Sequence, residues 1–165
     1  MSSSRVSEPA PAWLRELAQA QARYQELLGW PVSVRVGHQN LVVAVGAVLV
    51  AIAMPAGLGE RVRAQLGISI LAAPIIASAD GSRWTFLAKS GSSIRPAVAE
   101  DLSGSKVRLA PWGSYVVLPT GLDTTSGRVE RWIESPQPNR LLPDACTIVG
   151  LTRRLTYGQR VGAAA

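Results

Sequence analysis

The stretch Pro74-Ile-Ile-Ala-Ser-Ala-Asp-Gly-Ser-Arg-Trp-Thr-Phe-Leu-Ala88 carries the clearest structural signal in this chain of 165 residues. Its first five residues are apolar or small, and polar and apolar residues alternate from Arg83 to Ala88. Asp80-Gly81 between them is a dipeptide typical of tight turns between antiparallel strands. We therefore predict a β-hairpin. On its second strand, alternation places Trp84 and Phe86 on one face and Arg83, Thr85 and Leu87 on the other.

Helical and strand patterns alternate through the rest of the chain. Residues 1–11 have the composition of a flexible tail, and residues 12–28 show a helical pattern that Gly29 ends. Before the hairpin we expect strands over 32–36 and 41–45 and a helix that begins at Pro55 and ends at Gly67. After it we expect a helix over 96–102, a second hairpin of 106–110 with 114–118, a strand over 129–133, a helix from Asp144 to about Leu155, and a disordered tail over 156–165. This order predicts one α+β domain over residues 12–155, with a mostly antiparallel sheet flanked by helices.

An uncharged stretch of 21 residues, from Gln39 to Gly59, raises the question of a membrane span. Its densely apolar part, Leu41 to Met54, has only 14 residues, and Pro55 and two glycines follow. The many valines favour a buried strand. We therefore expect no membrane span. The alternative is that Leu41 to Met54 forms an interface with another protein or a second copy of the chain.

The composition is basic and poor in groups that bind metals. The chain has 17 Lys and Arg residues against 11 acids, a net charge of +6, and 15 of the 17 are arginines, which make planar bidentate contacts with phosphate. Nucleic acid, single-stranded or duplex, is thus a candidate partner, although a GC-rich coding sequence produces the same bias. A single Cys146 and a single His38 exclude a disulfide framework, a cysteine zinc site and a histidine-rich metal centre. Cys146 lies in an apolar run, so we expect a buried thiol, and the polar N-terminus favours a reducing cytoplasm.

Catalytic motifs are not found in the sequence. No phosphate-binding glycine loop occurs, since Gly57-Leu-Gly59 is better explained as the start of a helix. The acids fall in predicted helices, turns and loops, so we predict no catalytic residue, no metal ligand and no cofactor. Arginines stand beside tryptophans at Arg83-Trp84, Arg131-Trp132 and, further apart, Arg108 and Trp112. These pairs are typical either of a surface that stacks bases or of core tryptophans, and we favour the core.

Two segments resemble the bifunctional DNA primase/polymerase domains. Gly113-Ser-Tyr-Val-Val-Leu-Pro-Thr120, followed by Gly127-Arg-Val-Glu-Arg-Trp-Ile-Glu134, is similar to a Gly-Gly-Tyr-Val-Val-x-Pro-Pro-Ser run and a later Gly-x-Tyr-x-Trp strand of that family. Trp30-Pro31-Val32 resembles the Gly-Trp-Pro-Val that ends the family's first helix. Small actinobacterial proteins with this domain share a stretch like Gly46 to Pro55. The resemblance spans about Ala12 to Pro143 and implies a primase-polymerase core and a place in DNA replication.

The chain departs from that family at its catalytic residues. Active members bind metal through an Asp-x-Asp at the end of an apolar strand, and this spacing is not found on a predicted strand here. Their Ser-Gly-Gly-x-His-x-Tyr-Phe strand aligns with residues 79–86, where Arg83 replaces the histidine that contacts nucleotide phosphate. In the shorter relatives an Asp often stands at the position of Val50. Without the carboxylates, two-metal nucleotidyl transfer would lose most of its transition-state stabilisation.

We therefore interpret the chain as a non-catalytic relative of the primase-polymerases that acts as an accessory factor on nucleic acid. Two alternatives remain: a residual nucleotide-binding or nucleotidyl-transfer enzyme that uses loop acids such as Asp80, and a protein-interaction module. The residues expected to contact phosphate are Arg83, Arg95, Arg108, Arg128 and Arg131.

Overall fold

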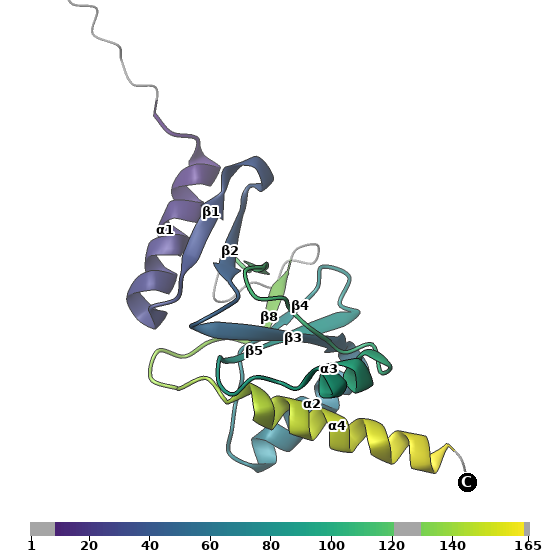
Figure 1. Cartoon of the computed structure of the whole chain (residues 1–165). Helices are drawn as coiled ribbons and strands as arrows, with labels where there is room; N and C mark the ends of the chain where they lie inside the picture. Colours follow the sequence, from purple (N-terminus) through teal and green to yellow (C-terminus); the bar gives the residue numbers. More distant parts are fainter. Residues whose placement is uncertain (1–8, 121–129, 164–165) are drawn as a thin grey trace, which may run out of the picture.

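The computed structural model describes residues 9–120 and 130–163. Within these residues the chain forms four α-helices, one short 3-10 helix and two antiparallel sheets, which is the α+β class predicted from the sequence (Figure 1). The helices are α1 (Ala12–Leu28), α2 (Ala56–Ile68), α3 (Pro96–Ser103) and α4 (Ala145–Gly162), with η1 (Val36–His38). The strands are β1 (Val32–Arg35), β2 (Asn40–Ala44), β3 (Leu49–Pro55), β4 (Ile75–Ala77), β5 (Arg83–Lys89), β6 (Arg108–Leu109), β7 (Tyr115–Leu118) and β8 (Arg131–Glu134).

The larger sheet, called the main sheet below, has the strand order β6-β3-β5-β4-β8, and all its neighbours are antiparallel. Its first four strands arise from the chain order β3-α2-β4-β5-α3-β6. This connectivity and strand order define a split βαβ (ferredoxin-like) arrangement, to which β8 adds an outer strand. The smaller sheet has the order β1-β2-β7.

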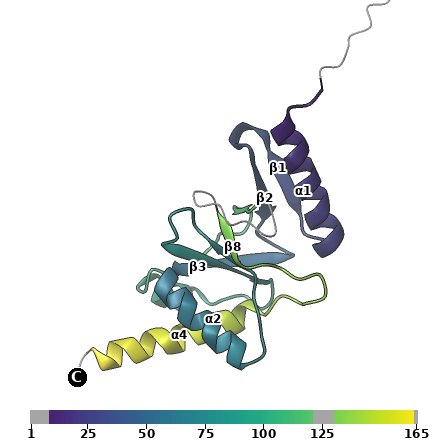
Figure 2. The ribbon, with the colours of Figure 1, turned by 180° about the vertical axis from the view of Figure 1, so that it is seen from behind.

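One face of the main sheet packs against helices and is called the helix face. Ile52 and Met54 of β3 and Trp84 and Phe86 of β5 lie in this core together with residues of α2 and α4. Gly59 brings α2 close to the sheet, because a Cβ atom there would lie only 2.8 Å from a ring carbon of Trp84. Figure 2 shows α2 and α4 on this side of the sheet.

The opposite face of the main sheet is only partly covered. Helix α1 and the small sheet stand over it and form a second core that includes Leu49, Ile76 and Leu87 of the main sheet (Figures 1 and 2). The Tyr24 hydroxyl donates to the Pro119 carbonyl at 2.7 Å and accepts from the Trp132 indole N–H at 3.0 Å. These bonds connect α1 with β8 and with the end of β7, so they fix the covering layer to the sheet.

Several predicted elements are confirmed. The hairpin of β4 and β5 turns at Gly81, whose φ is 75°, and α1 ends at Gly29 with a φ of 64°. The short helix after the hairpin is present as α3, and the closing helix begins with Asp144, whose carboxylate accepts from the Cys146 N–H.

Other predictions were wrong. Strand β3 was not expected, because no polar residue separates it from β2 in the apolar run. Residues 106–110 and 114–118 do not pair with each other: β6 pairs with β3, and β7 pairs with β2. The turn at residues 111–113 therefore joins the two sheets.

The apolar stretch, the C-terminal end of α4 and Cys146 bear on further predictions. Leu41 to Met54 is largely buried in the protein's own core. No helix among the described residues is long and apolar enough to cross a membrane. Residues 156–162, expected to be a disordered tail, continue α4. Cys146 is exposed at the start of that helix, although we expected it to be buried.

Candidate nucleic-acid interface

The uncovered part of the main sheet forms the floor of a groove. Ala53 of β3 pairs with Thr85 of β5 on one side and with Arg108 of β6 on the other. Paired residues of antiparallel strands point to the same face. Because Ile52, Phe86 and Leu109 belong to the helix-face core, the row Arg108, Ala53 and Thr85 points to the opposite, open face.

The groove has a volume of about 750 Å³, which lies within the range of ligand sites. Its floor includes Ala51, Ala53 and Thr85, and its walls come from α3, from residues 107–111 and from the start of β7, where Tyr115 is exposed. The floor side chains are small, so backbone and methyl groups form a nearly flat surface. Among the described residues that line the groove, Arg108 is charged and none is acidic.

Arg83 lies on the same face as the first residue of β5, where it pairs with Pro55, the last residue of β3. Its guanidinium donates to the Lys106 carbonyl at 3.0 Å, so it reaches across the end of β3 to the segment that carries Arg108. The Cα atoms of Arg83 and Arg108 are separated by two strand spacings and two residues, or roughly 12 Å. The ion pairs found among the described residues include neither arginine.

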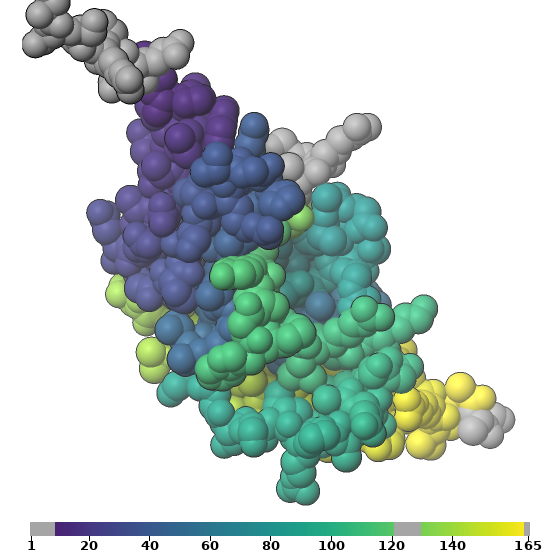
Figure 3. All heavy atoms as spheres, turned by 45° about the horizontal axis from the view of Figure 1, so that its top comes forward, coloured from purple at the N-terminus to yellow at the C-terminus, as the bar shows by residue number. Residues whose placement is uncertain are grey.

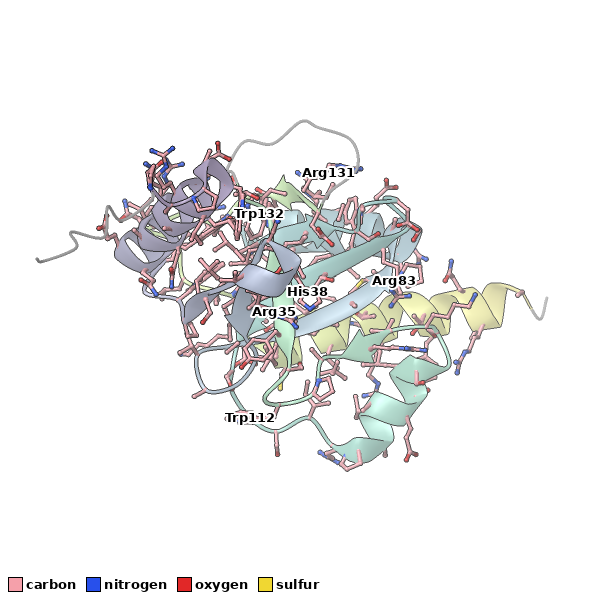
Figure 4. The ribbon with its side chains drawn as sticks, turned by 90° about the horizontal axis from the view of Figure 1, so that it is seen from above. Arg35, His38, Arg83, Trp112, Arg131 and Trp132 are labelled. Atoms are coloured by element: carbon pink, nitrogen blue, oxygen red, sulfur yellow. The ribbon has the colours of Figure 1, made fainter. Side chains whose placement is uncertain are left out.

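The other predicted arginines are not brought to this groove. Arg95 is exposed and is the N-cap residue just before α3, at the end of that helix away from β6. Arg131 pairs with Ala77 on the helix face, and its guanidinium lies beside Gly81. Figure 4 looks onto the open face and shows Arg83 and Arg131 at separate places on the sheet. Arg128 lies outside the described residues.

The tryptophans do not form a stacking surface on the groove floor. Trp84 belongs to the helix-face core, as the alternation of β5 predicted. Trp132 is half-buried beside Tyr24 in the second core. Trp112 is 72% exposed, but it packs over Gly46 on the loop before β7, away from Arg83 in Figure 4.

The groove lining contains no Asp or Glu residue among the described residues. No group of three or more His, Cys, Asp or Glu residues that could hold a metal ion occurs within residues 9–120 and 130–163. The open face of β3 carries Ala51 and Ala53, spaced as an Asp-x-Asp would be. Asp80, the acid considered for catalysis, accepts hydrogen bonds from Ser78 and Ser82 in the β4–β5 turn, and these bonds lower its pKa to about 2.

Comparisons with known proteins add no family. The chain matches no protein-family model, no curated protein and no solved structure. The resemblance to the primase-polymerases therefore stays a prediction, and the groove is interpreted from its own chemistry.

Lys106 also lies at this site, although the sequence analysis did not identify it as a candidate phosphate contact. It lies in the turn from α3 to β6, next to the groove, with its carbonyl bound to Arg83. Lys106 has a φ of 60°, which is a left-handed backbone conformation. The sequence did not predict it, because glycine usually occupies such positions.

Proposed function

We propose that this protein binds a single strand of nucleic acid in the groove of the main sheet, as a non-catalytic relative of the primase-polymerases and an accessory factor in the cytoplasm. The observation that carries the proposal is the joint position of Arg83 and Arg108 on an open sheet face whose lining contains no acid. Arginine guanidinium groups on a concave surface without acids favour phosphate.

The topology supports a strand-like ligand. RNA-recognition motifs bind single strands on the open face of a four-stranded sheet, where aromatic side chains of the two central strands stack on bases. In this protein the exposed part of the central strands β3 and β5 presents Ala53 and Thr85 instead. We therefore expect contacts mainly to phosphates, with weak preference for base sequence and strong dependence on salt.

The size of the groove favours a single strand over a duplex. A volume of about 750 Å³ suits a few nucleotides. Helix α3 and Tyr115 border the floor, so a rigid duplex would meet these walls before its phosphates reached Arg83 and Arg108.

Fluorescence anisotropy with labelled single-stranded and duplex DNA at two salt concentrations tests the proposal. We expect single strands to bind more tightly, with a logarithmic salt slope of about −0.7 for each phosphate contacted. Arg108→Ala should weaken binding and reduce the slope by about one contact. Arg140→Ala, which removes an exposed arginine from the loop before α4, serves as the matched control and should leave binding unchanged.

Two results would overturn the proposal. One is the absence of salt-dependent binding at micromolar protein. The other is an equal loss of affinity in the two variants, because that would assign binding to net charge instead of to the groove.

A further inference from the structure

The turn between α3 and β6 holds a lysine in a conformation that usually belongs to glycine. The Lys106 N–H donates to the Ser103 carbonyl at 2.9 Å, and the Val107 N–H donates to the Leu102 carbonyl at 3.1 Å. This pair of bonds defines a Schellman motif, whose left-handed residue is usually glycine. Lys106 occupies that position with a φ of 60°. A side chain strains the backbone there, so the turn retains a lysine where glycine would be easier to accommodate.

The same turn is held from the sheet side by Arg83. Its guanidinium donates to the carbonyl of Lys106 itself, at 3.0 Å. Arg108 follows two residues later and lines the groove. Three cationic residues, Arg83, Lys106 and Arg108, thus meet where the groove ends.

Helix α4 brings further positive charge to the other side of this turn. A Cβ atom at Gly104 would lie 3.1 Å from a guanidinium nitrogen of Arg160, so Arg160 lies directly against the turn. Arg160 also pairs with Asp101 at 3.6 Å, as does Arg153 at 3.5 Å. Figure 3 shows the α3–β6 segment in contact with the yellow end of α4.

Two acidic residues at this end, Asp101 and Asp80, are engaged in local contacts, and Glu100 of α3 is exposed. Asp101 is shared between Arg153 and Arg160. Asp80 accepts hydrogen bonds from both serines of its own turn. The cations therefore exceed the acids around the turn, and the positive surface continues from the groove to α4.

We infer that the nucleic-acid strand does not end in the groove but continues over the α3–β6 turn to α4, with Lys106 and Arg160 as further phosphate contacts. This inference rests on the proposed function and extends its site. The turn places the Cα atom of Lys106 two residues before Arg108, at the exit of the groove. A strand long enough to pass the turn gains contacts that a short strand cannot make.

Binding of two labelled thymidine oligonucleotides, of roughly 5 and roughly 15 nucleotides, tests this path. We expect the longer one to bind more tightly with a steeper salt slope. Arg160→Gln should weaken binding of the longer oligonucleotide by about threefold or more and leave the shorter one unchanged. Lys106→Gly should weaken binding and reduce the salt slope by about 0.7. Its melting temperature should not fall, since glycine suits the backbone of this position.

Ile70→Gly is the matched control. Ile70 takes the left-handed position, with a φ of 56°, in the corresponding motif that ends α2. The substitution relieves the same backbone strain far from the turn and should leave binding unchanged. If Lys106→Gly and Arg160→Gln bind both oligonucleotides like the wild type while Arg108→Ala weakens them, the extended path is wrong and the groove proposal stands. If the wild type binds neither oligonucleotide, both fail.

Discussion

The two faces of the main sheet use neighbouring residues of the same strands for opposite purposes. Ile52 and Phe86 face α2 and α4 and are fully buried, whereas their neighbours Ala53 and Thr85 face the groove and remain partly exposed. Large apolar side chains therefore supply stability on one side, and small ones leave space on the other. Residues that line the groove can therefore be substituted without loss of the fold, because stability and ligand binding depend on different residues.

The largest expected effect separates the two faces directly. Phe86→Ala removes a ring from the helix-face core and should lower the free energy of unfolding by about 3–5 kcal/mol. Thr85→Ala, its neighbour on the open face, should change it by less than about 1 kcal/mol. Urea unfolding of both variants measures the difference. Similar losses in the two variants would contradict the assignment of the faces.

The covered part of the open face depends on Tyr24, which gives a pH test. Burial raises the pKa of Tyr24 to about 12 from its ordinary value of 10.0, although the Trp132 hydrogen bond and Arg23 act in the opposite direction. Between these values the unfolded chain loses the proton and the folded protein keeps it. Ionisation of Tyr24 therefore does not lower the free energy of unfolding well below pH 10. As the pH rises from 10 to 12, it lowers the free energy of unfolding by about 2–3 kcal/mol, which corresponds to two pKa units.

Tyr24→Phe serves as the reference for this measurement. The other titrating groups are common to the two proteins, so the difference between their stabilities isolates Tyr24. Urea unfolding at several pH values from 9 to 12 should show a steeper loss of stability in the wild type. Parallel curves would show that the hydroxyl ionises as easily in the folded protein as in the unfolded chain.

The sequence indicated the parts of this comparison that depend on local pattern. Asp80-Gly81 and the alternation of β5 placed Trp84 and Phe86 opposite Arg83 correctly. Strand β3 was not predicted, because it lies in the same apolar run as β2. The two strands differ in the sheets to which they belong, and the sequence does not reveal this. The pairing of β6 with β3 joins residues more than 50 positions apart, and without it the position of Arg108 on the open face could not be inferred.

The same limit applies to the rest of the site. Alternation alone does not predict the face of the sheet on which Arg131 lies, because the pairing of β4 with β8 shifts register between Ile75 and Ile76. Lys106 depends on how α3 ends, which only the hydrogen bonds of the folded turn define. Local periodicity therefore predicted the hairpin and the face on which Arg83 lies. Which other cations lie near Arg83 depends on strand pairing between distant parts of the chain.

A smaller effect tests the close contact of α2 with the helix face. Gly59→Ala gains helix propensity but places a Cβ atom 2.8 Å from the Trp84 ring, so we expect a net loss of about 1–2 kcal/mol. Gly57→Ala in the same helix has no atom within 4 Å of its Cβ position and should gain up to about 1 kcal/mol. Thermal unfolding of both variants gives the signs. A gain in both would mean that α2 can move away from the sheet at little cost.

The smallest effect on stability is expected on the groove floor, where ligand binding should respond instead. Ala53→Leu adds three carbon atoms to a side chain that faces open space, so the free energy of unfolding should change by less than about 0.5 kcal/mol. The added volume occupies the floor between Thr85 and Arg108, and single-stranded DNA should bind more weakly by anisotropy. Ala64→Leu on the exposed side of α2 is the control for added apolar surface. Unchanged binding by Ala53→Leu would place the strand elsewhere, and a large loss of stability would mean that this face is packed like the other.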